Sequence, residues 1–127
     1  MGPKLTIDGN KFSDFEGFVR EFNINVFGND RTWTGGFVML NDLLRGGYGT
    51  PEGAFTIEWR HSHKSRKDLG KEATLAWLEL RKDRVHPTAR DLWAKRIDLM
   101  QHDLGDTLFL KIVDIIVSHE NITLILA

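Results

Sequence analysis

Three short runs typical of β-strands stand near the beginning, in the middle and at the end of the sequence. They cover residues 4–7, 54–60 and 122–127 and are rich in β-branched and aromatic side chains. Strands this far apart, with helical patterns between them, pair in parallel because each connection crosses back over the sheet. The last run is almost continuously apolar, which predicts a strand covered on both faces. The sequence therefore predicts an α/β fold in which a small three-stranded parallel sheet packs with several α-helices.

Apolar residues with helical spacing separate these runs. The first helix is expected to follow Ser13, because Glu16 lies three residues later and completes a capping box. Residues 26–36 show no period and predict a loop. Further helices are predicted over residues 37–44, 71–83, 89–104 and 107–119, together with a short polar helix that Gly70 ends.

The segment "RGGYGTPEG" (residues 45–53) holds four glycines and one proline. It can be interpreted as a phosphate-binding loop, a flexible linker or a rigid turn. Phosphate loops need their glycines directly before a helix, whereas here a helix precedes the glycines and a strand follows them. The order favours a turn that presents Tyr48 to a partner. A turn with no role in binding is the alternative.

Charge and composition exclude several classes of function. The formal net charge of −1 argues against nonspecific nucleic-acid binding, which needs a basic surface. The one basic cluster, residues 63–67, lacks stacking aromatics and is interpreted as a solvated helix face. The absence of cysteine excludes disulfides and thiolate chemistry. The start of the chain is not signal-like and no apolar run approaches a membrane span, so we expect a cytoplasmic protein with no membrane partner.

No pattern in the sequence indicates an enzyme. His61 and His63 alternate at the end of a predicted strand, but no third metal ligand with suitable spacing follows them. No nucleophile-elbow pattern occurs, and the many carboxylates select no catalytic pair. We therefore expect neither a metal nor a cofactor. The competing hypothesis is a metal-dependent or phosphate-binding enzyme that uses His61, His63 and Arg45.

Four segments together resemble the barstar family, the small protein inhibitors of barnase-type ribonucleases. They are "LTIDGNKFSDFEGF", "LNDLLRGG", "FTIEWRHSHKS" and "IVDIIVSHENITLILA". The likeness covers nearly the whole chain except residues 69–106, which are longer than in barstar and predict a helical insertion. The resemblance implies one barstar-like domain over residues 1–127. It places the chain in a subgroup of barstar-related proteins that are longer than barstar itself.

In the barstar family an acidic helix and its adjoining loop occupy the active site of a ribonuclease, with carboxylates in place of the RNA phosphates. Asp42 matches the key acid and Asp114 a supporting acid, whereas Val38 and Ser118 stand where two other acids would be. The resemblance implies a partner-binding surface that comprises Thr32, Trp33, Val38, Asn41, Asp42, Arg45, Tyr48, Asp114 and Ser118. With two acids missing, the expected target has a cleft less basic than that of barnase.

The sequence thus predicts an inhibitor or immunity protein for a ribonuclease or a related nuclease toxin. The alternative is a binding module without inhibitory function that uses the inserted helices, with Trp77 and Trp93 or their exposed neighbours as contact residues. The two hypotheses differ in whether Asp42 matters for binding. Neither of them fixes the target or the oligomeric state.

Overall fold

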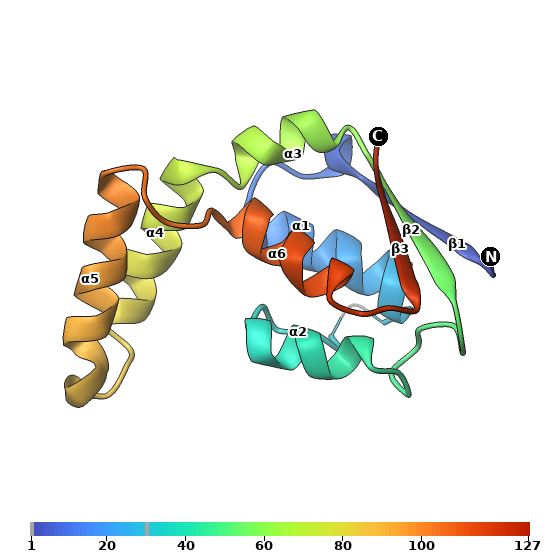
Figure 1. The fold of residues 1–127 in the computed structure, drawn as a ribbon, viewed down its shortest axis with the longest axis horizontal. Helices are drawn as coiled ribbons and strands as arrows, with labels where there is room; N and C mark the ends of the chain where they lie inside the picture. Colours follow the sequence, from blue (N-terminus) through green and yellow to red (C-terminus); the bar gives the residue numbers. More distant parts are fainter. Residues whose placement is uncertain (1, 30) are drawn as a thin grey trace.

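A three-stranded parallel sheet with helices packed on one face forms the body of the protein (Figure 1). The computed structural model describes residues 2–29 and 31–127. Strands β1 (Lys4–Asp8), β2 (Phe55–Arg60) and β3 (Ile122–Leu126) lie in the order β1-β2-β3, with β2 in the centre. Ile57 of β2 pairs with Leu5 of β1 on one side and with Leu124 of β3 on the other. The predicted α/β class and parallel three-stranded sheet are confirmed.

In the described residues, six α-helices and three shorter helical turns connect the strands. The α-helices are α1 (Phe15–Phe22), α2 (Phe37–Leu44), α3 (Ser62–Asp68), α4 (Lys71–Lys82), α5 (Arg90–Gln101) and α6 (Leu108–Val117). The shorter turns are the 3-10 turns η1 (Gly9–Lys11) and η3 (Pro87–Ala89) and the π-helical turn η2 (Asn23–Phe27). In the part of the chain that the structure describes, no helix has both the length and the apolar character needed to cross a membrane.

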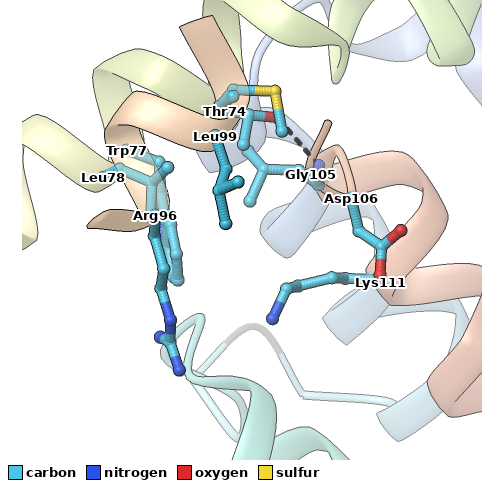
Figure 2. A pocket seen from close by; sticks show the side chains of 10 residues that line it. Thr74, Trp77, Leu78, Arg96, Leu99, Gly105, Asp106 and Lys111 are labelled. Atoms are coloured by element: carbon cyan, nitrogen blue, oxygen red, sulfur yellow. Dashed lines mark hydrogen bonds between the residues drawn. The ribbon is translucent and has the colours of Figure 1, made fainter. Parts of the chain in front are cut away.

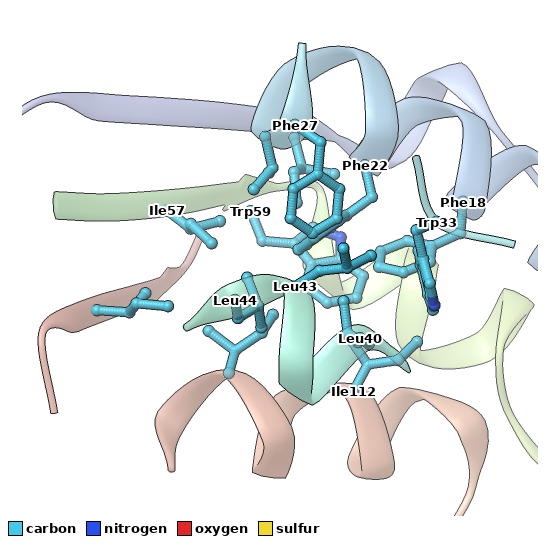
Figure 3. Packing of buried hydrophobic residues seen from close by; sticks show 14 of the residues in the cluster. Phe18, Phe22, Phe27, Trp33, Leu40, Leu43, Leu44, Ile57, Trp59 and Ile112 are labelled. Atoms are coloured by element: carbon cyan, nitrogen blue, oxygen red, sulfur yellow. The ribbon is translucent and has the colours of Figure 1, made fainter. Parts of the chain in front are cut away.

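The hydrophobic core lies between the sheet and helices α1, α2 and α6 (Figure 3). Alternate side chains of β2, namely Phe55, Ile57 and Trp59, are buried against these helices. The Trp59 ring stacks on Phe18 of α1 with 5.0 Å between centroids, and its indole N–H donates to Ser65 Oγ at 3.0 Å. The apolar ring of this tryptophan is therefore packed in the core, and its N–H is paired with a hydrogen-bond acceptor.

The prediction that the last strand is covered on both faces is wrong. Ile122 is buried, but Thr123 and Ile125 are exposed. The reason is that β3 is an edge strand and the core forms on only one face of this sheet. On the other face of β2 the carboxylate of Glu58 lies 3.7 Å from the Lys4 ammonium.

Two predictions about the first helix and the loop after it are also wrong. Helix α1 is capped by Asp14 rather than Ser13, because the Asp14 carboxylate accepts a 2.8 Å hydrogen bond from the Gly17 amide. Aspartate and serine cap helices about equally well, so local sequence did not distinguish the two neighbours. The expected loop from residue 26 in fact starts inside η2, which extends α1 and buries Val26 and Phe27 in the core.

Helices α4 and α5 form a hairpin that projects from the body of the protein (Figure 1). The hairpin has a small apolar cluster of its own, made of Leu78, Ile97 and Met100. The last predicted turn of the 89–104 helix is absent, since α5 ends at Gln101 and Leu104 is 72% exposed. A helix that packs against only one neighbour buries a narrow stripe, so the remaining leucines of the periodic pattern stay in solvent.

Candidate functional site

An open groove of about 650 Å³ runs between α2, the glycine-rich loop that follows it and the side of α4. We call it the α2 groove. It is lined by Gly36, Phe37, Val38, Met39, Asp42, Leu43, Tyr48 and Arg81. Three residues that the sequence predicted for partner binding, Val38, Asp42 and Tyr48, therefore lie in one cavity.

Helix α2 positions Val38 and Asp42 by burying its other side. Leu40 and Leu44 belong to the core, so the residues one turn apart on the opposite face point outward. Val38 is 81% exposed, the highest value among the exposed large hydrophobic side chains of the described residues. The Asp42 carboxylate lies 3.8 Å from the Arg45 guanidinium, and both groups are exposed. Such a surface pair contributes little to stability, so Asp42 can exchange Arg45 for a cation of a partner.

The glycine-rich loop places Tyr48 at the edge of the α2 groove. Gly49, the next residue, has a φ of +106°, and a Cβ built on it would stand 2.0 Å from the carbonyl oxygen of Phe27. Only glycine allows this approach of the loop to η2. Tyr48 itself is 54% exposed. The interpretation of the loop as a turn fixed against the body is thus supported at Gly49.

Arg81 completes the α2 groove from the opposite side, and sequence reasoning missed it. Its guanidinium stacks over the Trp77 ring at 4.5 Å from the ring centroid. Burial, and secondarily the charge of Arg84, lowers the pKa of Arg81, although an arginine stays charged at neutral pH. No sequence signal could have found it, because α4 lies far from α2 along the chain and meets it only in the folded protein.

The α2 groove is balanced in charge rather than acidic. Asp42 supplies its carboxylate and Arg81 its guanidinium, and the other lining residues are uncharged. Tyr48 adds a phenol to the lining. Tyrosine and arginine beside exposed apolar side chains are the composition of the energetically important centre of a protein–protein interface. The arrangement suits noncovalent contact with another protein.

Asn41 faces away from the α2 groove and joins α2 to the end of α6. Its side-chain oxygen accepts a 3.0 Å hydrogen bond from His119 Nε2. Burial first, and the charge of Arg45 second, lowers the pKa of His119, which favours the neutral ring. Asn41 therefore holds the helix that carries Asp42.

The prediction of Trp33 as a contact residue is wrong. Its side chain is 1% exposed and packs in the core, where it meets Phe18 edge-on at 5.9 Å between centroids. The Asn23 amide fixes its backbone, donating to the Trp33 carbonyl and accepting from the Trp33 N–H, both at 2.8 Å. An aromatic held in this way cannot reach a partner. Thr32 is half-buried and does not line the α2 groove.

Asp114 and Ser118 lie on the exposed side of α6, as their spacing predicted, but they do not line the α2 groove. The Ser118 hydroxyl donates to the Ile115 carbonyl at 2.6 Å. The structure therefore brings Asp42 together with Val38 and Tyr48 and leaves the two α6 residues outside their cavity. Whether they take part in binding stays a prediction.

His61 and His63 do not share one side of a strand, because β2 ends at Arg60 and His63 belongs to α3. His61 Nδ1 lies 3.0 Å from a carboxylate oxygen of Asp8. A hydrogen bond from the Asn10 amide, followed by the one from His61, lowers the pKa of Asp8. Over residues 2–29 and 31–127, no group of three or more histidine or acidic side chains could hold a metal ion.

Part of the basic cluster at residues 63–67 is used within the fold. The Lys64 ammonium donates to the Phe12 carbonyl at 2.6 Å and to the Asp68 carboxylate at 2.5 Å. The Arg66 guanidinium lies 4.7 Å from the centroid of the Phe109 ring. These two cations tie α3 to the start of the chain and to α6, which is a structural role.

No family model, no curated protein and no solved structure matches the chain.

Proposed function

We propose that this chain is a barstar-like inhibitor or immunity protein that binds a ribonuclease or a related nuclease toxin. In this proposal α2 and the loop over residues 45–53 cover the active site of the toxin. The observation that supports it most is the exposure of Val38 next to Tyr48 and Asp42 in the α2 groove. An exposed valine stabilises a complex when a partner buries it.

Each group in the α2 groove has a part in this proposal. Val38 and Tyr48 enter the mouth of the toxin cleft, where burial of their apolar surface drives association. Asp42 leaves Arg45 and pairs with a cationic side chain of the toxin that otherwise contacts a phosphate of the nucleic acid. Arg81 donates hydrogen bonds at the rim. The access of nucleic acid to the catalytic groups is blocked sterically.

The balanced charge of the α2 groove bears on the class of target. A surface with one carboxylate beside one guanidinium gives weak electrostatic steering, so the association rate should fall only modestly with salt. The proposal therefore favours a toxin whose cleft has an apolar rim and few excess positive charges. A strongly basic nuclease is the poorer match.

The experiment is isothermal titration of the protein into a panel of small microbial ribonucleases and nuclease toxins, with a nuclease activity assay in parallel. Val38→Asp and Asp42→Ala are compared with Ile125→Asp and Asp91→Ala. Ile125 is a control for Val38, since it is also an exposed apolar residue, at 42%, and lies on β3 outside the α2 groove.

We expect one-to-one binding that inhibits the nuclease and that weakens at least about tenfold in each α2 variant, as for loss of one interface contact. The two controls should bind like the unmodified protein. Equal weakening by Val38→Asp and Ile125→Asp, or binding without inhibition, would contradict the proposal.

A second candidate function is a binding module that uses the α4–α5 hairpin. It is supported by the exposed leucines of the hairpin and the turn after it, which are Leu80, Leu92, Leu99 and Leu104. Under this alternative Leu92→Asp abolishes capture of the partner and Asp42→Ala has no effect. Affinity capture of the partner with both variants separates the two functions.

A further inference from the structure

A separate pocket of about 200 Å³ lies between the α4–α5 hairpin and the beginning of α6 (Figure 2). It is lined by Thr74, Trp77, Leu78, Arg96, Leu99, Met100, Gly105, Asp106, Leu108 and Lys111. The α2 groove shares none of these residues. The pocket is therefore a distinct candidate site with its own chemistry.

The interior of the pocket is apolar. Leu78, Leu99, Met100 and Leu108 supply aliphatic walls, and Trp77 supplies an aromatic one. An apolar cavity of about 150 Å³ is large enough to hold benzene in a well-studied protein. A pocket of about 200 Å³ therefore has room for a single aromatic ring and a short substituent.

Two cationic side chains stand at the pocket, one from each of its walls. In Figure 2 Arg96 of α5 and Lys111 of α6 reach the same side of the pocket. Among the described residues neither forms an ion pair; each lies near an aromatic ring, Arg96 at 5.0 Å from the Trp93 centroid and Lys111 at 6.0 Å from that of Phe37. Even with Asp106 counted, the lining carries an excess of positive charge.

One further observation concerns Trp77. Its indole N–H is buried and has no hydrogen-bond partner among the described residues. Buried donors in folded proteins are almost always paired, so this unpaired donor is an exception. Because the N–H has essentially no exposed surface, Trp77 offers a ligand the carbon atoms of its ring and not its donor.

We propose that this pocket binds a small aromatic carboxylate. The ring occupies the apolar interior against Trp77, and the carboxylate lies between the Arg96 guanidinium and the Lys111 ammonium. A neutral ring would leave both cations without an anion, and a small inorganic anion would leave the apolar walls empty. Ligand sites that combine mostly apolar walls with a few convergent polar groups are typical of small-molecule binding.

The test uses phenylacetate as the probe, with phenylacetamide as its neutral counterpart of the same shape, and acetate as the anion without a ring. Binding is measured by titration calorimetry and by the thermal midpoint of unfolding of the full chain. The variants are Arg96→Gln and Lys111→Gln. The control is Lys95→Gln, which removes an exposed cation of α5 that does not line the pocket.

We expect phenylacetate to bind at one site and to raise the thermal midpoint by about 5 °C at ten times its dissociation constant. Phenylacetamide and acetate should each bind at least about tenfold more weakly, and Arg96→Gln and Lys111→Gln should each weaken phenylacetate about tenfold. Lys95→Gln should leave its affinity unchanged.

Equal affinity for phenylacetate and phenylacetamide would overturn the proposal, and this comparison needs no variant. If acetate bound as tightly as phenylacetate, the site would be only a surface anion contact, and the proposal would be overturned as well. The absence of binding up to about 10 mM ligand, far above the dissociation constants of useful small-molecule sites, would have the same meaning.

Discussion

The close approach of Gly49 to η2 gives a sharp test of how the loop that carries Tyr48 is held. In Gly49→Ala the new Cβ would stand 2.0 Å from the Phe27 carbonyl oxygen, against 3.4 Å for the beginning of ordinary contact. The loop and η2 must therefore separate by more than an ångström. Gly47→Ala is the matched control, because Gly47 also has a positive φ, +85°, but a Cβ there meets no described atom within 4 Å.

The magnitudes follow from this geometry. An alanine in the left-handed region costs about 1–2 kcal/mol, and this term is common to both variants. Overpacking adds about 1–3 kcal/mol at Gly49 alone. The free energy of unfolding should thus fall by about 2–5 kcal/mol in Gly49→Ala and by about 1–2 kcal/mol in Gly47→Ala.

Urea denaturation of both variants, followed by far-ultraviolet circular dichroism, measures the two losses. Backbone NMR shifts then report whether the change at Gly49 reaches Tyr48 and α2. If the two variants lose the same stability to within about 0.5 kcal/mol, and the shifts around Tyr48 are unchanged, the loop is not held by this approach and our reasoning about Tyr48 fails.

Three further predictions concern hydrogen bonds and titrating groups. Asn23→Ala leaves the buried Trp33 N–H and carbonyl unpaired and should lower the free energy of unfolding by about 2–5 kcal/mol in urea titrations. The control Asn25→Ala loses one partly buried hydrogen bond and should cost about 1 kcal/mol. Similar losses in the two variants would contradict the role of Asn23 in fixing Trp33. The pKa of His119 is lower in the folded chain than its usual 6.5, so the unfolded chain binds the proton more readily. The free energy of unfolding should therefore decline as pH falls below about 6.5. In His119→Gln this part of the pH dependence should disappear from denaturation curves. The lowered pKa of Asp8 contributes stability above its usual 3.8 that is lost as pH falls further, so Asp8→Asn should flatten the acid unfolding curve below about pH 4.

The sequence by itself determined the three strands, the α-helices and their order. The alternation in "FTIEWR" and the apolar spacing over residues 37–44 are local patterns, and local patterns decide whether a segment becomes a strand or a helix. The parallel pairing of three strands followed from the helices between them. The outward direction of Val38 and Asp42 followed as well, because a helix that buries Leu40 and Leu44 turns its opposite face, which carries Val38 and Asp42, to solvent.

Tertiary structure alone decided what lies beside these residues. Trp33 and Tyr48 are both aromatic residues in irregular segments, yet one is in the core and the other at the rim of the α2 groove. Local sequence does not distinguish them, since the difference comes from the Asn23 amide that fixes Trp33 and the Phe27 carbonyl that Gly49 approaches. Both contacts form only when separate segments meet in the folded chain.

The same reason explains how cationic side chains come to line the two cavities. Arg81 reaches the α2 groove from α4, and Lys111 meets Arg96 at the pocket beside the hairpin. Sequence periodicity shows which face of a helix is apolar but not which other helix that face will meet. Long-range packing selects the neighbours, and the neighbours decide whether an exposed cation lies in solvent or lines a site.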